Sequence, residues 1–596
     1  MHLTNMVVLK RVLAILLFFW GGLLQSFVFA ENNTSKIEVK SAGGKLTQTM
    51  MDKNNTIYVF HDNFILIEDI IIPDGCTIEF DGGCIHGVHK IQGRNTKIIA
   101  KTNKIFSDSV KIEGVWNVSE VYPEWFGARG DGKYDDAIAI NRCLQFGSNS
   151  VEKPLRILFT KPKYIVDQII YFAGKSNICF EGTEKNVIQK CNRSNINMFD
   201  GAFCNNITIS NLTLDGSLED WNNIYLDSLN WSKKRFNACI IAASNTSNFI
   251  LDNCVIQNFN YGVYIGGADE RKRKTDGEKH TEHISIINCV FYNNRLSCID
   301  TYNRHGLYIN NNFFKDNGNI SVHIEPTMYS ELSDPFDVSD ILMSDYSVDG
   351  VNICDNTFLW TETSSAGIKL YKGVYAANIT NNHFINASKA ILIESTKMFS
   401  ISNNSIKKGD GIVLYGKIGS GSIYGNILLN VSRGISCYND STIMGSVDVH
   451  DNIIIYKEGL TTSPDNFRAQ NSKFHDNIIK GYFDNDDWKK KGVLDITGAS
   501  NCEIYNNKLL KFSDTAIPFF IVPITTQDEL SYYINKGVRI FGNITEQPLE
   551  FEFSTEVSET RPPNPYVGEH YFDLKLNKML YFLGDKWVDA FGKEVK

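Results

Sequence analysis

The chain has 596 residues, of which 59 are basic and 68 acidic, and its formal net charge is −9. This length exceeds what one compact core supports, so the chain needs either several domains or a solenoid whose coils pack on their neighbours. The acidic balance argues against a nucleic-acid partner, because nucleic-acid binders carry a basic excess. Aromatic residues make up 12% and Pro residues number 13, which is typical of β-rich sequence.

The first thirty residues have the pattern of a secretory signal peptide. Lys10 and Arg11 precede an apolar run that begins at Val12, and small residues end the segment at Ala30. Gln25 interrupts the run before it provides the roughly 20 apolar residues of a membrane span. We therefore expect cleavage near Ala30, a periplasmic, cell-surface or extracellular location, and no transmembrane segment in the mature chain.

The thirteen cysteines do not form a recognisable framework. Their number is odd, their spacing is scattered, and no CxxC pair or Cys/His cluster with zinc spacing occurs. Several alternate with Ile or Asn in the repeat described next. We predict that most are small buried hydrophobic residues.

One six-residue pattern organises the chain: an apolar residue, any residue, Asn, Asp or Gly, then Asn or Cys, any residue and an apolar residue. Twelve copies begin at Ile209, Leu251, Ile286, Ile309, Ile353, Ile379, Ile401, Ile423, Val449, Phe474, Ile504 and Ile540. From Ile353 onward the starts lie 26, 22, 22, 26, 25, 30 and 36 residues apart.

A period of this length with short alternating strands indicates one solenoid coil per repeat. The Asn pair falls at the corner between two strands, where Asn tolerates left-handed backbone and its amide can stack on the next coil's Asn. The Leu-x-x-Leu-x-Leu signature of leucine-rich repeats is missing. The pattern therefore predicts an all-β, right-handed parallel β-helix.

The segment Tyr122 to Gly132 (YPEWFGARGDG) and the following Tyr134 to Ile140 resemble the opening motif of the pectate-lyase-like β-helix superfamily. Residues 158–182 are similar to the first coils of that superfamily. The resemblance covers roughly residues 57–547 and implies the fold. It leaves the chemistry open, because the superfamily contains lyases, hydrolases, epimerases and phage tailspikes.

Three acidic residues in this motif invite a catalytic interpretation, which we reject in favour of a structural one. Asp135 falls where a helix N-cap belongs, and residues 137–145 have the pattern of a short helix that covers the open end of the solenoid. Asp131 and Asp136 flank the same turn. We expect the active site elsewhere.

Both ends of the repeat region have their own patterns. Residues 31–120 read as N-terminal β-rich coils, and the β-helix proper is assigned to 121–550, after a signal peptide at 1–30. A small C-terminal β module is assigned to 556–596, and a Pro-rich linker lies near its start, from Arg561 to Pro565. Its aromatic residues either form the core of a hairpin or stack on sugar rings: Tyr571, Tyr581 and Trp587.

A second set of strands, which precedes the corners, supplies the candidate site. Because side chains alternate along a strand, its outward residues form two columns across the coils. The first column contains Tyr264, Asp300, His323, Lys369, Leu392, Val413 and Ser436, and the second contains Gly266, Tyr302, Glu325, Tyr371, Glu394, Tyr415 and Tyr438. Acids, a base and aromatic platforms concentrate between Asp300 and Glu394. Two long insertions border them, at 268–282 and 326–346.

These columns admit two catalytic hypotheses. Asp300 and Glu325 differ by one coil and one alternate position, which puts their backbones about 8 Å apart, within the roughly 6.5–9.5 Å window of inverting glycosidases. Glu325 is then the general acid, and His323 orients or protonates Asp300. In the lyase hypothesis, Lys369 or Tyr371 removes a proton beside a uronic acid carboxylate.

The remaining residues of the predicted site contact substrate. His323 or Arg304 would neutralise the carboxylate in the lyase, and the other contacts come from Tyr264, Tyr302, His305, Glu394 and Tyr415. The sequence indicates no cofactor and no metal ligands. A lyase could use Ca²⁺, but the sequence shows no carboxylate cluster for it, so metal use stays open. The partner is a polysaccharide, and a non-catalytic adhesin that binds glycan is the third hypothesis. The oligomeric state stays open.

Overall fold

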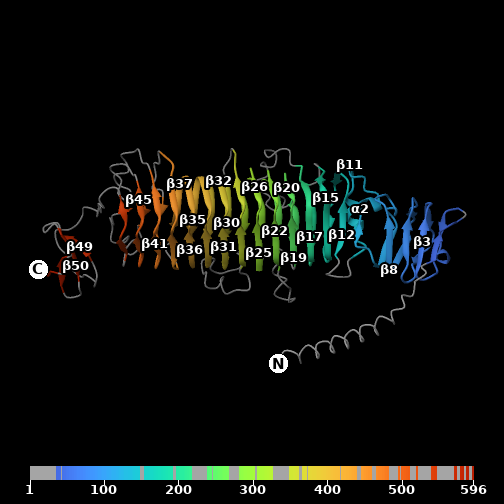
Figure 1. Ribbon diagram of the computed structural model, residues 1–596, viewed down its shortest axis with the longest axis horizontal. Helices are drawn as coiled ribbons and strands as arrows, with labels where there is room; N and C mark the ends of the chain where they lie inside the picture. The colour runs from blue at the N-terminus through green and yellow to red at the C-terminus, as the bar shows by residue number, and fades with distance from the viewer. Residues whose placement is uncertain are drawn as a thin grey trace, which may run out of the picture.

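The computed structural model shows a long stack of parallel strands, with the N-terminal coils at one end and a small antiparallel sheet beyond the other (Figure 1). The residues that it describes are 35–41, 43–147, 154–191, 196–217, 238–243, 246–266, 281–301, 305–325, 348–361, 365–371, 373–416, 418–438, 445–458, 465–481, 494–496, 499–510, 519–520, 538–545, 570–573, 578–582, 586–589 and 593–595. The expected signal peptide at 1–30 lies outside them.

The main solenoid has three faces, because each coil contributes three strands and each strand pairs in parallel with its counterpart in the next coil. Face A consists of β14 (Ile170–Tyr171), β16 (Phe199–Ala202), β18 (Ala238–Ala243), β21 (Tyr261–Ile265), β24 (Ser297–Thr301), β27 (Ile320–Ile324), β30 (Ala366–Tyr371), β33 (Lys389–Glu394) and the second halves of β35 (Ser405–Tyr415) and β37 (Ile427–Tyr438). This arrangement confirms the predicted parallel β-helix.

Faces B and C complete each coil. Face B consists of β10 (Glu120–Val121), β12 (Leu155–Phe159), the first halves of β15 (Ser176–Lys190) and β17 (Asn205–Asp215), β19 (Ser247–Asp252), β22 (Glu282–Ile287), β25 (His305–Asn310), β28 (Asp349–Cys354), β31 (Ala376–Thr380), β34 (Met398–Ser402), β36 (Ser420–Tyr424), β38 (Val447–His450), β41 (Lys473–His475), β44 (Glu503–Tyr505) and β47 (Arg539–Phe541). Face C consists of β11 (Asp131–Asp135), β13 (Lys163–Val166), the second halves of β15 and β17, β20 (Val255–Gln257), β23 (Val290–Tyr292), β26 (Phe313–Lys315), β29 (Thr357–Leu359), β32 (His383–Ala387), the first halves of β35 and β37, β39 (Ile453–Tyr456), β42 (Ile478–Lys480), β45 (Lys508–Leu510) and β48 (Ile544–Thr545).

Shorter elements precede and follow these faces. The N-terminal coils contain β1 (Ser35–Glu38), β2 (Lys45–Leu46), η1 (Gln48–Met50), β3 (Thr56–Phe60), β4 (Phe64–Leu66), β5 (Ile70–Ile71), β6 (Thr77–Phe80), β7 (Ile85–His86), β8 (Lys90–Ala100) and β9 (Lys111–Trp116). Near the C-terminus, β40 (Asp465–Asn466), β43 (Leu494–Asp495) and β46 (Phe519–Phe520) pair in parallel, and β49 (His570–Asp573), β50 (Lys578–Phe582) and β51 (Trp587–Asp589) pair antiparallel.

One continuous hydrophobic core runs along the axis, from Val39 in the N-terminal coils to Leu509 in β45. Inward side chains from the three faces fill it. On face C the same position is aromatic in consecutive coils, so that rings stack at centroid distances of 5.0, 4.6 and 4.6 Å along Phe291, Phe314, Phe358 and Phe384. Each coil therefore buries its apolar side chains mainly against the coils beside it.

The corner between faces B and C carries a ladder of buried Asn side chains, as the repeat predicts. The residue before each ladder Asn has a left-handed backbone, for example φ 54° at Asn403. Asn404 shows the pattern: its Oδ1 accepts from the backbone N–H and the Nδ2 of Asn382, and its Nδ2 donates to the carbonyl of Ile379 and to Oδ1 of Asn426. The ladder comprises Asn312, Asn356, Asn382, Asn404, Asn426, Asn452, Asn477, Asn507 and Asn543.

Replacing Asn404 with Ala is expected to lower the free energy of unfolding by about 3 kcal/mol, because it leaves buried donors and acceptors on the adjacent coils without partners, each at a cost of about 1–3 kcal/mol. Urea unfolding followed by circular dichroism measures the change. Asn352→Ala is the matched control, since Asn352 points outward on face B and its side chain donates only to Gly350. Equal losses in the two variants would contradict the role of the ladder.

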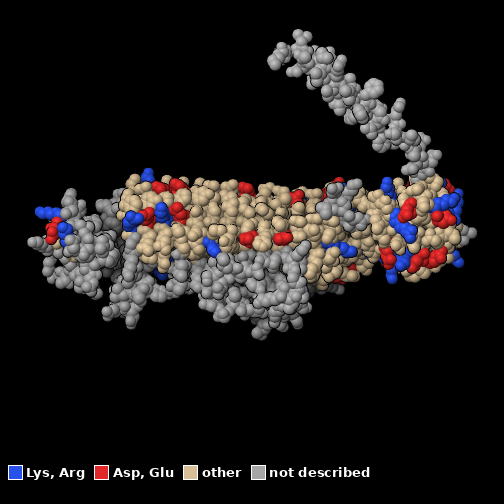
Figure 2. Space-filling model, turned by 90° about the horizontal axis from the view of Figure 1, so that it is seen from below, with Lys and Arg blue, Asp and Glu red and all other residues tan. Residues whose placement is uncertain are grey.

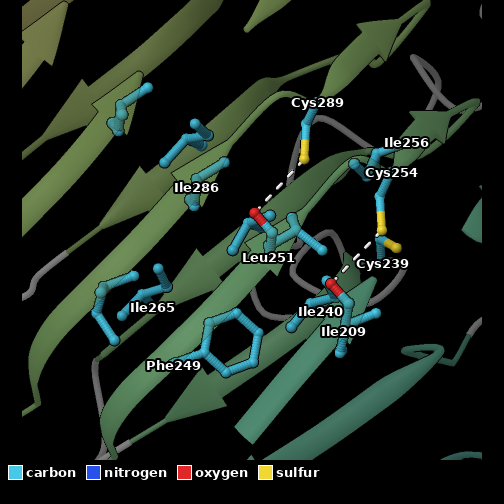
Figure 3. Packing of buried hydrophobic residues seen from close by; sticks show 14 of the residues in the cluster. Ile209, Cys239, Ile240, Phe249, Leu251, Cys254, Ile256, Ile265, Ile286 and Cys289 are labelled. Carbon is cyan, nitrogen blue, oxygen red and sulfur yellow. Dashed lines mark hydrogen bonds between the residues drawn. The ribbon is translucent and has the colours of Figure 1, made fainter. Parts of the chain in front are cut away.

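Cysteine takes the place of Asn in the first rungs of this ladder (Figure 3). The thiol of Cys254 donates to the carbonyl of Ile209, and that of Cys289 donates to the carbonyl of Leu251, each in the preceding coil. All thirteen cysteines are free thiols and ten of them are buried, which confirms that most act as small hydrophobic residues. Burial raises the pKa of the Cys289 thiol well above its ordinary value.

The acidic residues of the opening motif accept hydrogen bonds from backbone amides, in agreement with the predicted structural role. Asp136 is buried and accepts from the amides of Arg129 and Gly130, and burial raises its pKa. Asp135 accepts from the amides of Ala137 and Asp167. The carboxylate of Asp131 accepts from Lys133.

The predicted helix exists as α2 (Ala137–Cys143), but its N-cap position is Asp136 and not Asp135. It follows the 3-10 turn η2 (Pro123–Phe126) and lies between the N-terminal coils and β12 (Figure 1). Its buried residues Ile140 and Cys143 belong to the continuous core. The prediction that the helix covers an open end of the solenoid is therefore wrong. The N-terminal coils precede the helix and share its hydrophobic core.

Candidate functional site

The outward residues of face A form the two columns that the sequence predicts. In the first column the paired residues of successive coils are Tyr264, Asp300, His323, Lys369, Leu392, Val413 and Ser436. In the second, Tyr371 pairs with Glu394, then Tyr415 and Tyr438 follow. Tyr302, Arg304 and the insertion 326–346 lie outside the described residues, as does most of the insertion 268–282.

Three of the predicted catalytic side chains converge at β24 and β27. His323 Nδ1 lies 3.6 Å from Asp300 Oδ1, and His323 Nε2 lies 3.8 Å from Glu325 Oε2. One polar atom from each of the three residues lies within 4.8 Å of the other two. The imidazole is therefore placed between two carboxylates.

This separation corrects the expected geometry of the carboxylate pair. The nearest oxygens of Asp300 and Glu325 approach to within 4.8 Å, shorter than the window of about 6.5–9.5 Å for inverting glycosidases and nearer to the roughly 5–5.5 Å of retaining ones. The register that the sequence predicts is right, since Asp300 pairs with His323. The estimate of about 8 Å concerned the two backbones, whereas the carboxylate oxygens lie closer together because both side chains approach the imidazole.

The cluster contains buried polar atoms without hydrogen-bond partners. Asp300 is 7% exposed, and its buried Oδ1 has no hydrogen bond. The buried Nε2 of His323 also has no hydrogen bond. Among the ion pairs of the described residues, both carboxylates pair only with His323. Buried polar atoms in folded proteins nearly always have a partner, and two of the exceptions in the described residues lie together in this cluster.

A second group continues the cluster along the axis. Lys369 Nζ lies 3.6 Å from Glu394 Oε2 on the next coil and 4.2 Å from the ring centroid of Tyr371. The ring of Tyr371 in turn lies 6.1 Å from the imidazole of His323, measured between centroids. A base, an acid and an aromatic ring thus adjoin the Asp300, His323 and Glu325 cluster.

The other predicted contact residues divide between two faces. Tyr264 lies one coil before Asp300 and packs edge-on against Tyr261, at 5.9 Å between centroids. Tyr415 is exposed and lies one coil beyond Glu394 in the second column. His305 does not belong to this group: it begins β25 on face B, where its Nδ1 lies 2.6 Å from Asp349 Oδ1.

Face B carries a row of rings that the sequence analysis did not single out. Successive rings stack with planes within 6° and centroids 4.5–5.2 Å apart along Tyr424, His450, His475, Tyr505 and Phe541. The recurrence of an aromatic residue or His in the second place of the six-residue repeat was the available signal. Because the rings cover one another, their faces are not platforms for sugars.

A hollow also lies on face B, away from the charged cluster. Its volume is about 670 Å³, and its lining is mostly small side chains such as Ala377, Ser400 and Gly421, with Asp448 as the one titratable group. In the view from below, uncharged side chains cover the middle of the solenoid and charged ones gather at both ends (Figure 2). The hollow supplies no acid–base pair, so face A is the better candidate for chemistry.

The comparisons with known proteins identify the fold. A family model described as a right-handed β-helix region matches residues 158–330 and 341–509, in agreement with the predicted handedness. No curated protein matches the chain. Among the residues that the structure describes, no helix has the length and apolar character to cross a membrane.

Solved structures similar to this one include a tailspike, an adhesin and a glucanase. Tailspike protein 3 of bacteriophage CBA120 is 12% identical, with 80% of this chain and 69% of that chain covered and a TM-score of 0.37. The surface adhesin PfbA of Streptococcus pneumoniae is 16% identical, with coverage of 68% and 100% and a TM-score of 0.40. The catalytic unit of an α-1,3-glucanase from Streptomyces thermodiastaticus is 8% identical, with coverage of 72% and 70% and a TM-score of 0.35.

Proposed function

Since the chain belongs to the right-handed β-helix family, we propose that face A, between Asp300 and Glu394, binds a polysaccharide and cleaves a glycosidic bond in it. One observation supports this most strongly: Asp300, His323 and Glu325 converge from adjacent strands, with polar atoms within 4.8 Å of one another. Titratable groups that converge on one surface, with unpartnered buried atoms among them, are typical of catalytic sites.

Hydrolysis is the favoured reaction. Glu325 is the more exposed of the two carboxylates, with 23% of its side chain accessible against 9% for Asp300, so it is the group that reaches the glycosidic oxygen. It donates a proton to that oxygen as the C–O bond breaks. A water oxygen bonds to the anomeric carbon and its proton passes to His323, so the base is the imidazole and not the second carboxylate. The Asp300 carboxylate, 3.6 Å from Nδ1, stabilises the imidazolium that forms. The aromatic ring of Tyr371 provides a surface for a sugar ring.

β-Elimination is the second candidate, and the Lys369 group favours it. In this reaction Lys369, or Tyr371 beside it, removes the proton next to the carboxylate of a uronic acid, and the glycosidic C–O bond breaks to leave a double bond. The 4.2 Å approach of Lys369 Nζ to the Tyr371 ring and its ion pair with Glu394 support a positioned base. This route does not need Glu325.

A polysaccharide substrate is consistent with export of the chain, which remains an expectation from residues 1–30. The net charge of −9 favours a neutral glycan or a locally bound acidic one over nucleic acid. A non-catalytic glycan-binding surface would use the same aromatic and charged columns without bond cleavage.

The test incubates the mature protein with plant, algal and host glycans and determines the product masses. Fragments whose masses sum to the glycan plus one water support hydrolysis. A fragment lighter than a hydrolysis product by one water, with an unsaturated end, supports elimination. Binding of a glycan without cleavage of any in the panel would overturn the catalytic proposal in favour of an adhesin.

A further inference from the structure

We propose that Asp300, His323 and Glu325 form a binding site for a divalent first-row transition metal ion, with Zn²⁺ as the representative. A bound ion would occupy the atoms that act as acid and base in the proposed hydrolysis. The inference is therefore independent of that reaction: it stands on the geometry of the three residues, and it is tested on protein without glycan. It concerns the metal use that the sequence left open.

The charges of the cluster are the first argument. Two carboxylates share a single histidine, and in the described residues no Lys or Arg forms an ion pair with either of them. Lys369 is the nearest cation along the column, but its ammonium pairs with Glu394 and lies over the ring of Tyr371. Partly buried carboxylates without a cation are unfavourable, and a divalent ion compensates both at once.

The unpartnered atoms are the second argument. Asp300 is more than nine-tenths buried and directs its free Oδ1 into the cluster, and His323 Nε2 is buried there without a hydrogen bond. Elsewhere on the solenoid, a His between two carboxylates is fully bonded: His475 lies 2.6 Å from Asp476 and 2.9 Å from Asp448. The long contacts of His323, at 3.6 and 3.8 Å, leave space that an ion can fill.

The donor set selects the metal. One imidazole nitrogen and two carboxylate oxygens suit Zn²⁺, which binds such atoms at about 2.0–2.2 Å and often keeps an open fourth position. Tetrahedral ligands at that distance lie about 3.4 Å apart, so donor atoms now within 4.8 Å need shifts of about 1 Å. Ca²⁺ requires roughly six to eight oxygen ligands and is not matched by these three residues.

The experiment titrates Zn²⁺, Ca²⁺ and Mg²⁺ into protein stripped with chelator, using calorimetry, and records Co²⁺ absorption as a second readout. Wild type is expected to bind Zn²⁺ at this site and to show a Co²⁺ band from nitrogen and oxygen ligands. His323→Gln and Glu325→Gln should lower the Zn²⁺ affinity by roughly 100-fold or more, since loss of an outer partner alone costs about 10–100-fold. Ca²⁺ and Mg²⁺ should bind far more weakly.

His475→Gln is the matched control, because it removes a histidine that also lies between two carboxylates. It should retain the affinity and the Co²⁺ band of wild type. The proposal is overturned if His323→Gln, with an unchanged melting temperature before metal is added, binds Zn²⁺ as wild type does. If the protein binds Zn²⁺ but cleaves no glycan, the metal site is supported and the proposed function is contradicted. If it cleaves a glycan but binds no Zn²⁺, the proposed function is supported and the metal site is contradicted.

Discussion

Replacing Glu325 with Gln is expected to lower kcat/KM for glycan hydrolysis by about 10²- to 10⁴-fold, which is the contribution of a positioned general acid. The amide keeps the size of the side chain but has no proton to donate to the leaving oxygen. It also keeps the backbone bond in which the Glu325 amide donates to Thr301, so the strand end is retained. The measurement uses whichever glycan the product analysis identifies.

Asp448→Asn is the matched control for this variant. Asp448 is also an outward carboxylate beside a histidine, but it stands on face B, where its Oδ1 lies 2.9 Å from His475 Nε2. It should leave hydrolysis unchanged. If Glu325→Gln cleaves as fast as wild type while Lys369→Met does not, elimination by the Lys369 group replaces hydrolysis as the reaction. Unchanged cleavage in both variants would remove face A from the mechanism.

The second large effect concerns the pH dependence of stability and comes from Asp465. This carboxylate is completely buried, and burial raises its pKa from 3.8 to about 6, although hydrogen bonds from Tyr456, Ser436 and two backbone amides oppose the shift. The folded protein therefore holds this proton more tightly than the unfolded chain does. The protonated Asp465 contributes fully to the free energy of unfolding below pH 4. As the pH rises through 6 that contribution is lost, and the free energy of unfolding falls by about 3 kcal/mol.

Asp465→Asn tests this linkage, because an amide does not titrate. Urea unfolding of both proteins between pH 4 and 7.5 gives the difference in their free energies of unfolding at each pH. Wild type should lose about 3 kcal/mol relative to the variant across that range. Carboxylates elsewhere contribute equally to both proteins and cancel in the difference. A difference that does not change with pH would show that Asp465 has the same pKa in the folded and unfolded states.

The fold was predictable because its physical causes repeat along the sequence. The apolar alternation and the left-handed corner recur from coil to coil, and Asn follows the corner in most copies. A pattern that is weak in a single copy is therefore specific across twelve. The same periodicity placed Asp300 beside His323 and Tyr371 beside Glu394, because the two-residue period of a strand determines which side chains point outward.

What the sequence could not supply depends on side-chain torsions and on residues outside the repeat. The approach of Asp300 and Glu325 to His323 follows from rotamers, which backbone spacing does not determine. Asp465 lies between the copies that begin at Val449 and Phe474, outside the six-residue pattern, so no periodic signal marked it as a buried acid. Likewise, the sequence predicted helix α2 and the β-rich coils that precede it, but not that the helix and these coils share one continuous core with the main solenoid.

The Asn ladder also bears on how such a molecule can change length during evolution. Each ladder Asn accepts at Oδ1 from the Asn of the preceding coil and donates from Nδ2 to the Asn of the next coil. Because every coil offers the same donor and acceptor, one coil can follow any other in the ladder. Between β27 and β28 the chain gains many residues, yet His305 and Asp349 on the flanking coils remain paired in register. Whole coils can therefore be duplicated or lost as units, and insertions at the corner between faces A and B can diversify without disturbing the scaffold.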